Sequence, residues 1–202
     1  MYRLIRFLAL PFFRLFYMPK IKGKENLPKE GNYIIICNHF GKADAIVLVS
    51  LYKQKIYFMA KKEWFSGKFK AKLFSTLGAI PVDREKADFT SVKKCLEVIK
   101  RGDILAIFPE GTRNKVNDEL QEVKGGAAMI AFMAKATVVP IALKKKFKAF
   151  HRNELYIGKP FDYSVYYGQK LNSELDGTLT EIMRDNLQKT VDIAQGKLAE
   201  EK

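Results

Sequence analysis

The chain has 202 residues, of which 48% are hydrophobic and 29% are charged. This length suits one well-buried domain, and the balance of apolar and charged residues excludes a globally disordered chain. Lys and Arg number 36 against 22 Asp and Glu, so the formal net charge is +14 and an anionic partner is expected.

The basic residues recur along the whole chain and do not form one arm or tail. Nucleic acid, an anionic membrane, and an acidic substrate or carrier protein would all be attracted by such a charge. The sequence has no reader helix and no aromatic stacking motif, so a nucleic-acid partner is not expected. Cys37 and Cys95 form no C-x-x-C pair and no zinc-type spacing. We therefore expect two buried, reduced thiols and no metal site.

The first eighteen residues, MYRLIRFLALPFFRLFYM, are apolar apart from three arginines. On a helix, Arg3, Arg6 and Arg14 fall within an arc of about 80°, which leaves a broad apolar face. Arginines disfavour a spanning helix, and no small-residue cleavage site follows the segment. We predict an amphipathic membrane-interface helix within residues 1–24, kinked or split at Pro11, with its arginines and the lysines that follow meeting lipid phosphates. The alternative is a helix buried against the domain.

Further along the chain, short apolar runs that suit buried strands alternate with segments of helical periodicity. This alternation predicts an α/β fold with a mixed, largely parallel sheet flanked by helices. In such sheets, chemistry collects in the loops beyond the strand ends, and the polar clusters of this sequence lie there. The predicted strands are 33–37, 56–60, 79–82, 104–108, 137–143 and 154–158, and the predicted helices are one ending at Tyr52, 62–76, 88–100, 125–136, and one from Leu179 onward.

The first polar cluster follows the apolar run YIIIC. His39 would lie at the entrance of a helix, with Asp44 about one turn in. The carboxylate could then accept from one imidazole nitrogen and leave the other free to take a proton, as in a general base. A single histidine near an aspartate is more often structural, so this pair needs support from other motifs.

Of three further clusters, two end predicted strands and one is itself a predicted strand. In Phe108–Arg113 (FPEGTR), Gly111 allows the backbone to approach a ligand closely, and Arg113 offers a planar fork of donors that suits phosphate. Gly78–Arg84 (GAIPVDR) also has a guanidinium at its tip, and Val138–Ala142 (VVPIA) is an apolar strand that holds a proline. Taken singly, each cluster could be a structural turn or strand.

Together and in this order, the four clusters resemble the four motif blocks of the lysophosphatidic acid acyltransferase family, from about residue 22 to residue 143. Lys61 lies in a stretch that resembles a lysine-bearing segment of the family. Gly41 and Asn114 stand where the family often has serine. The blocks are N-H-x4-D at Asn38, His39 and Asp44, the D-R pair at Asp83 and Arg84, F-P-E-G-T-R at 108–113, and V-P-I at 139–141.

This resemblance implies that residues 25–202 are an acyltransferase domain. The implied reaction moves a fatty acyl group from acyl-CoA or acyl carrier protein to the sn-2 hydroxyl of 1-acyl-glycerol-3-phosphate and gives phosphatidic acid. His39 would be the base and Asp44 would orient it, with no cofactor beyond the acyl donor and no covalent acyl-enzyme, because no G-x-S-x-G elbow is present. Glu110 would contact the glycerol backbone or hold Arg113. The implied substrate-binding residues are Lys61, Arg84, Glu110, Gly111, Thr112 and Arg113.

The same resemblance and the apolar N-terminus together place the protein at the cytoplasmic face of an anionic phospholipid membrane, as a peripheral or monotopic protein. The basic stretch 144–152 is a candidate surface for the donor or for lipid head groups, or else a solvated loop. Three alternatives remain: an acyltransferase for glycerol 3-phosphate or another lysophospholipid, a non-catalytic basic membrane-binding module, and a hydrolase.

Overall fold

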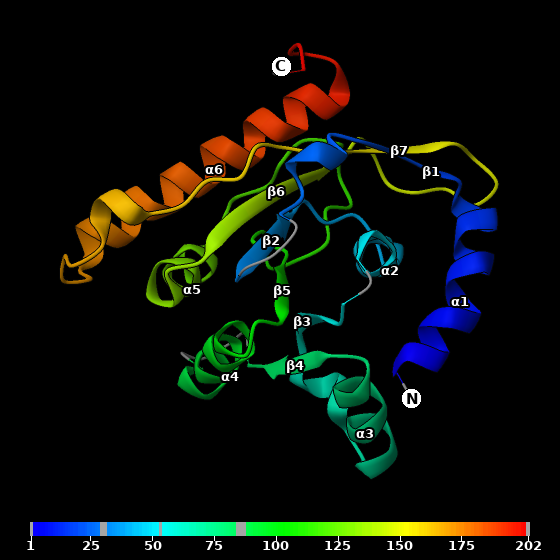
Figure 1. Cartoon of the computed structure of the whole chain (residues 1–202), viewed down its shortest axis with the longest axis horizontal. Helices are drawn as coiled ribbons and strands as arrows, with labels where there is room; N and C mark the ends of the chain where they lie inside the picture. The colour runs from blue at the N-terminus through cyan, green and yellow to red at the C-terminus, as the bar shows by residue number, and fades with distance from the viewer. Residues whose placement is uncertain (1, 29–31, 53, 84–87, 201–202) are drawn as a thin grey trace.

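The computed structural model of the chain describes residues 2–28, 32–52, 54–83 and 88–200. Within these residues, seven strands form one sheet in the order β1-β7-β6-β2-β5-β3-β4, with helices around it (Figure 1). The strands are β1 (Pro19–Lys22), β2 (Tyr33–Cys37), β3 (Ile56–Lys61), β4 (Ala79–Val82), β5 (Ile104–Ile107), β6 (Thr137–Leu143) and β7 (Asn153–Ile157). The helices are α1 (Tyr2–Tyr17), α2 (Ala43–Leu51), α3 (Lys68–Thr76), α4 (Phe89–Lys100), α5 (Gly125–Ala134) and α6 (Ser173–Gln195), with 3-10 helices η1 (Lys24–Asn26), η2 (Lys62–Phe65) and η3 (Ser164–Tyr166).

Five neighbouring strands, β6, β2, β5, β3 and β4, run parallel to one another. β7 is antiparallel to β6, and β1 runs parallel to β7. β2 is central and fully buried, and its Ile35 lies opposite Ala106 on one side and Val139 on the other. Because the five strands are parallel, their carboxyl ends meet along one side of the sheet, which we call the carboxyl edge. The predicted α/β fold with a largely parallel sheet is confirmed.

The sheet is covered on both faces, and alternate residues of β2 face the two cores. Ile34 and Ile36 pack with residues of α4, α5 and α6, whereas Ile35 and Cys37 pack with residues of α1 and α2. Figure 1 shows α5 and α6 on one side of the sheet and α1 and α2 on the other. A run of five apolar residues in β2 is therefore what a strand between two helical layers requires.

The structure differs from the sequence prediction in three elements. The single helix predicted at 62–76 is wrong: η2 ends at Phe65, and Gly67, with a φ of 85°, precedes α3. The last helix begins at Ser173, six residues earlier than its apolar periodicity indicated, because the Asn172 side chain caps it by accepting from the Leu175 N–H at 2.8 Å. β1 was not predicted; it pairs with β7, far away in the sequence.

α1 passes through Pro11 as one continuous helix, so the predicted split does not occur. The helix is tied to the domain by Arg6, whose Nη2 donates to the Tyr52 carbonyl oxygen at 2.6 Å, and by the buried Phe13. Arg6 therefore faces the protein and not a lipid phosphate. In the described part of the chain, no helix has the length and apolar character needed to cross a membrane. The opposite face of α1 exposes large apolar side chains: Leu4, Phe7, Leu8, Phe12, Leu15 and Phe16.

Gly78 closes the turn between α3 and β4 with a φ of 91°, and a Cβ atom there would lie 2.5 Å from the Ile56 carbonyl oxygen. Gly168 has nearly the same φ of 93° but no atom within 4 Å of its Cβ position. We expect Gly168→Ala to lower the free energy of unfolding by about 1–2 kcal/mol, through backbone strain alone. Gly78→Ala should lower it by roughly 1–3 kcal/mol more, because the clash is with backbone. Chemical denaturation of both variants measures the difference, and equal losses would contradict this account.

Candidate active site

The polar clusters singled out in the sequence gather at the carboxyl edge. His39 follows β2, Glu110 follows β5, Lys61 ends β3 and Asp83 follows β4. β2 and β5 are neighbours in the sheet, so the segments after them are brought side by side. This is the place where open α/β sheets bind ligands.

His39 and Asp44 are in contact, through His39 Nδ1 and Asp44 Oδ2 at 2.8 Å. Asp44 lies in the first turn of α2 and is fully buried. Its Oδ2 also accepts from the backbone N–H groups of Phe40 at 2.6 Å and Gly41 at 2.7 Å. Because this carboxylate oxygen accepts, Nδ1 of the neutral imidazole carries the proton and Nε2 is left to take one. The arrangement can therefore act as an oriented general base.

The imidazole is held on one face by an aromatic ring. His39 stacks on Phe108 with ring centroids 4.0 Å apart and an interplanar angle of 19°. Phe108 in turn lies over Phe58 of β3 at 6.4 Å. The His39 side chain keeps 17% of its surface exposed. The ring is thus restrained in orientation but reachable by a substrate.

The backbone of His39 is bonded on both sides to the segment after β5. Its N–H donates to Glu110 Oε1 at 2.6 Å, and its carbonyl oxygen accepts from the Asn114 N–H at 2.6 Å. Glu110 Oε2 accepts from the Gln121 N–H at 3.1 Å. Burial raises the pKa of the Glu110 carboxyl, and the two backbone donors oppose that rise. The FPEGTR turn is therefore fastened directly to the histidine.

The other predicted binding residues lie in this turn, at the end of β3, or outside the residues that the structure describes. Gly111 has a φ of 68°, in the left-handed region that favours glycine. Thr112 and Arg113 are exposed, and Arg113 directly precedes Asn114, which bonds to His39. Lys61 is exposed at the end of β3. Arg84 lies outside the described residues.

The Acyltransferase family model matches residues 19–144, which include His39, Asp44 and the FPEGTR turn. Among curated proteins, the chain is similar to a 1-acyl-sn-glycerol-3-phosphate acyltransferase of Bacillus subtilis, with 35% identity over 175 residues that cover 83% of this chain and 85% of the relative. This chain belongs to the lysophosphatidic acid acyltransferase family. It is an enzyme of the acyltransferase type.

Two further likenesses agree with that assignment. A 1-acyl-sn-glycerol-3-phosphate acyltransferase of Streptococcus pneumoniae is 33% identical over 153 residues, which cover 72% of this acyltransferase and 55% of that protein. The crystal structure of the 1-acyl-sn-glycerophosphate acyltransferase PlsC from Thermotoga maritima has a TM-score of 0.67. At 21% identity, covering 98% of this chain and 83% of that one, it shows a shared fold.

Two asparagines organise the site of the acyltransferase, and sequence reasoning gave neither a role. Asn38 donates to the Leu143 carbonyl oxygen at 3.0 Å and accepts from the Leu143 N–H at 2.8 Å, which ties the ends of β2 and β6 together. The buried Asn114 donates to the Glu119 carbonyl oxygen at 2.7 Å and accepts from the Val116 N–H at 2.9 Å. The available signals were the place of Asn38 in the N-H-x4-D block and the amide of Asn114 directly after the FPEGTR turn.

The lysines near the site differ in their surroundings, which the sequence alone does not show. Lys144 pairs with Glu154 at 3.8 Å, and Lys145 lines an open recess together with Lys197. Lys146, in the same stretch, lies near the segment that holds His39 and Asp44: its Cε and Asp44 Oδ1 each lie 3.9 Å from the position that a Cβ on Gly41 would take. Outside this stretch, the Lys124 side chain lies across the turn at Gly111, 3.1 Å from its Cβ position.

Neither cysteine of the acyltransferase is suited to covalent catalysis. Cys37 lies two residues before His39, but burial and the nearby carboxylates of Asp44 and Glu110 raise its pKa well above the ordinary value. Burial raises the pKa of Cys95 to about 12. The thiolate is the nucleophilic form, so both side chains are inert thiols near neutral pH. Among the described residues, no group of three His, Cys, Asp or Glu could hold a metal ion.

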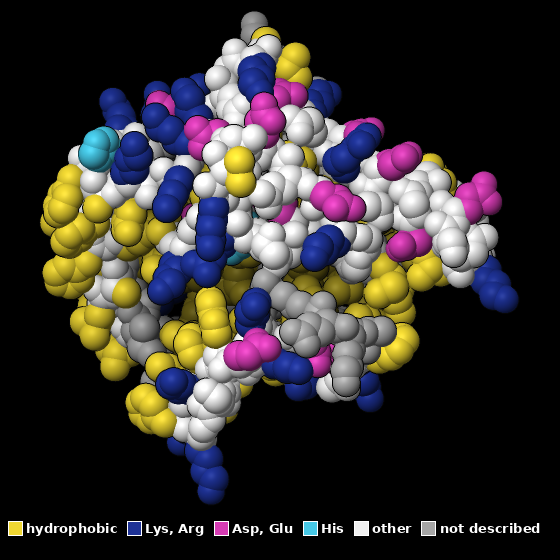
Figure 2. Space-filling model, turned by 180° about the vertical axis from the view of Figure 1, so that it is seen from behind, with side chains coloured by type: hydrophobic (Ala, Val, Ile, Leu, Met, Phe, Trp, Pro, Cys, Tyr) yellow, Lys and Arg dark blue, Asp and Glu magenta, His cyan; other side chains and the backbone are white. Residues whose placement is uncertain are grey.

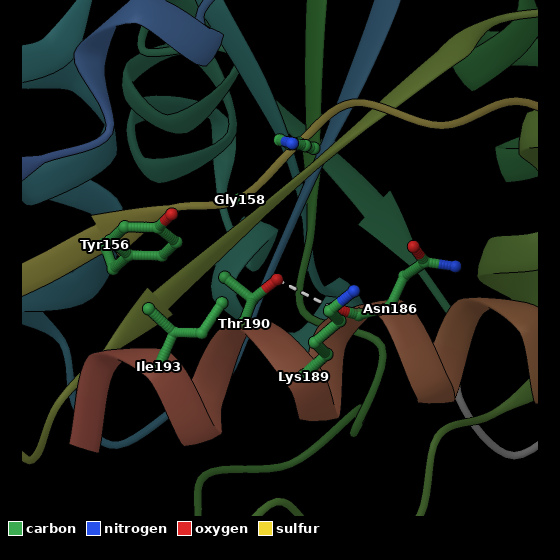
Figure 3. A pocket seen from close by; sticks show the side chains of 7 residues that line it. Tyr156, Gly158, Asn186, Lys189, Thr190 and Ile193 are labelled. Atoms are coloured by element: carbon green, nitrogen blue, oxygen red, sulfur yellow. Dashed lines mark hydrogen bonds between the residues drawn. The ribbon is translucent and has the colours of Figure 1, made fainter. Parts of the chain in front are cut away.

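A small cavity between β7 and α6 is unsuited to bind the substrate of the acyltransferase (Figure 3). Its volume of about 40 Å³ is little more than that of one water molecule. Thr190, which lines it, donates to the Asn186 carbonyl oxygen at 2.7 Å. Gly158 in its wall leaves no room for a side chain, since a Cβ would lie 2.5 Å from Thr190 Oγ1. The cavity is a packing gap.

We expect Glu110→Gln to lower the free energy of unfolding of the acyltransferase by about 1–3 kcal/mol. A glutamine has one acceptor oxygen, so its amide group would face one of the two backbone N–H donors, of His39 or of Gln121. Urea denaturation measures the loss, and Glu122→Gln is the control because Glu122 is exposed. A loss no larger than that of the control would show that this carboxylate does not hold the turn.

The pH dependence gives a second readout for the same variant. Because the pKa of Glu110 is raised, the folded protein keeps this proton to a higher pH than the unfolded chain does. The contribution of this group to stability is therefore present below the ordinary carboxyl pKa and is lost as the pH rises through the raised one. In Glu110→Gln, the free energy of unfolding should not show that decrease with pH. The same dependence of the free energy of unfolding on pH in both proteins would contradict the raised pKa.

Proposed function

We propose that this acyltransferase moves a fatty acyl group from a thioester donor to the sn-2 hydroxyl of 1-acyl-glycerol-3-phosphate, which gives phosphatidic acid. The observation that carries the proposal is the oriented His39–Asp44 pair fastened to the FPEGTR turn at the carboxyl edge. The names of the curated relatives support this acceptor. The proposed donor is acyl-CoA or acyl carrier protein, each of which carries the acyl group as a thioester.

In the proposed step, His39 Nε2 removes the proton from the acceptor hydroxyl as its oxygen forms a bond to the thioester carbonyl carbon. Asp44 stabilises the imidazolium that results. The tetrahedral intermediate then collapses, the carbon–sulfur bond breaks, and the departing thiolate takes the proton back from His39. Base assistance of this kind contributes roughly two to four powers of ten in rate. Positioning of the two substrates and stabilisation of the oxyanion would supply the rest.

We propose that the cations around the turn bind the phosphate of the acceptor. Thr112 and Arg113 are exposed beside the segment that holds His39, so a phosphate can reach them. Lys61 would approach from the end of β3, Gly111 would let the backbone come close, and Arg84 stays a sequence-based candidate for the same phosphate. Both substrates are anionic, so a chain with a net charge of +14 attracts them at long range.

We also propose that α1 lies in the interface of the cytoplasmic leaflet, so that the acyltransferase is peripheral or monotopic. The support is its exposed apolar face on a helix whose other face is anchored to the domain by Arg6 and Phe13. Apolar side chains that point into solvent along a whole helix favour burial in acyl chains. The lipid acceptor would then reach His39 from the surface on which the enzyme rests.

We expect His39→Ala to lower kcat for lysophosphatidic acid at least 100-fold, because the reaction loses its general base. The matched control is His151→Ala, since His151 is the second of only two histidines and is exposed. The assay uses purified protein with acyl-CoA and, separately, acyl carrier protein as donor, and circular dichroism checks folding.

Each other outcome of that assay overturns a defined part of the proposal. Activity retained in His39→Ala would remove the base. Faster acylation of glycerol 3-phosphate or of another lysophospholipid would change the acceptor. Release of the acyl group to water in the presence of acceptor would indicate a hydrolase, and an inactive wild-type protein that binds vesicles would indicate a membrane-binding module.

For α1, we expect Phe7→Ser with Phe12→Ser to weaken binding to anionic phospholipid vesicles at least tenfold, because two exposed phenyl rings no longer enter the acyl region. The measurement is co-sedimentation with vesicles. Phe89→Ser on α4 is the control, since it removes one ring that is even more exposed than Phe7 or Phe12, from a helix on the opposite face of the sheet. Unchanged sedimentation of the α1 variant would refute the placement of this helix.

A further inference from the structure

A second segment of the surface combines exposed aromatic rings with unbalanced positive charge. Residues 61–72, KKEWFSGKFKAK, hold five lysines and one glutamate. They end β3 and form η2 and the first half of α3; we call η2 and α3 together the η2–α3 segment. Trp64 is 44% exposed and Phe69 is 80% exposed. α3 has no buried residue and no acidic residue in its first turn.

α3 differs from an ordinary surface helix, which buries one apolar face in the core. The ring of Phe74 packs on Trp64 and on Phe65, each at a centroid distance of 5.8 Å, so the aromatic residues of the segment pack mainly on one another. None of them belongs to either of the two cores. An aromatic cluster outside the core, on the same segment as the 80% exposed Phe69, is the kind of surface that marks an interaction site.

The segment begins at the carboxyl edge, and the turn that follows it is linked to α1 through Lys55. η2 begins directly after β3, at the carboxyl edge where His39 follows β2. At its other end, α3 leads to Gly78, whose Cβ position is 3.2 Å from Lys55 Cε, and Lys55 Nζ lies 5.7 Å from the Tyr2 ring of α1. Figure 2 shows apolar side chains along the side formed by α1 and again below it, where α3 carries lysines.

We propose that the η2–α3 segment is a second membrane-contact element, which binds the surface of an anionic bilayer. Trp64 and Phe69 would enter the interfacial region, where aromatic rings are favoured, and Lys68, Lys70 and Lys72 would contact lipid phosphates. Lys62 is paired with Asp83 at 2.6 Å, so the three lysines of α3 carry the charge argument. This inference rests on the proposed membrane location of the enzyme.

Two membrane contacts would fix the orientation of the domain on the bilayer, whereas one would not. A single helix in the interface leaves the domain free to rotate about that helix. A second contact at η2 fixes the rotation with the carboxyl edge facing the bilayer, so that the hydroxyl of a lipid acceptor can reach His39. An acidic acyl carrier protein would also be attracted by the lysines, but Trp64 and Phe69 together with the adjacent apolar face of α1 favour lipid.

The first experiment needs no substitution, because Trp64 is the only tryptophan in the chain. Intrinsic fluorescence of the full chain therefore reports on this segment directly. We expect a shift of its emission to shorter wavelength when vesicles of phosphatidylglycerol and phosphatidylcholine are added, and quenching by lipids brominated on their acyl chains. Binding of the protein without any change in Trp64 emission would overturn the inference and leave the proposed role of α1 standing.

The second experiment compares charge-matched variants. K68Q/K70Q/K72Q removes three exposed lysines from α3, and K93Q/K94Q/K100Q removes three exposed lysines from α4, so both have the same net charge. We expect the α3 variant to bind phosphatidylglycerol vesicles at least tenfold more weakly than the α4 variant, with the difference shrinking as salt is raised. Phe69→Ser against Phe89→Ser is the same comparison for the apolar contact, since both rings are 80% exposed.

Activity on a short-chain acceptor dissolved below its micelle concentration should stay unchanged in all these variants, because none of the replaced residues lies in the catalytic turn. Equal vesicle binding by the α3 and α4 variants would overturn the inference. So would a raised KM for acyl carrier protein with vesicle binding unaltered, which would make the segment a donor-docking surface. If the wild-type protein binds no vesicles, the membrane location itself fails, and the inference fails with it.

Discussion

A buried carboxylate with three hydrogen-bond donors is the interaction on which the site depends. Asp44 Oδ2 accepts from His39 Nδ1 and from the N–H groups of Phe40 and Gly41. The side chain is fully buried, and these donors and its place in the first turn of α2 offset part of the cost of burying it. The same contacts fix the tautomer and direction of the imidazole. The hydrogen bonds to Asp44 Oδ2 therefore both stabilise the turn after β2 and orient the imidazole of His39.

The parallel sheet supplies the second half of this arrangement. β5 lies next to β2 in the sheet, so Glu110 after one strand can accept from the backbone of His39 after the other. Asn38 forms the corresponding link to β6 through Leu143. Three neighbouring strands therefore hold one histidine segment, and the exposed side chains of Thr112 and Arg113 project beyond it. A histidine held firmly beside the exposed Thr112 and Arg113 is consistent with the proposed reaction.

The surface around the site has an apolar part on α1 and a basic part on the neighbouring elements. Both parts would contact the bilayer in the proposed orientation. α1 is fastened to the domain by Arg6 and Asn153, whose Nδ2 donates to the Tyr17 carbonyl oxygen at 2.5 Å, and it exposes its remaining face. Lysines recur on the elements that flank the carboxyl edge, and Lys146 approaches the catalytic turn itself. A surface of this kind supports the proposed contact with an anionic membrane interface, from which the proposed lipid acceptor would arrive.

The sequence by itself determined the elements whose signal is local. The apolar run of β2, the alternation of strands and helices, and the five-residue spacing of His39 and Asp44 all depend on neighbours along the chain. The tertiary structure alone decided the strand order, the pairing of β1 with β7, the inward direction of Arg6 and the bond between Glu110 and the His39 backbone. These last features join residues tens of positions apart, and periodicity carries no information about which distant segments meet.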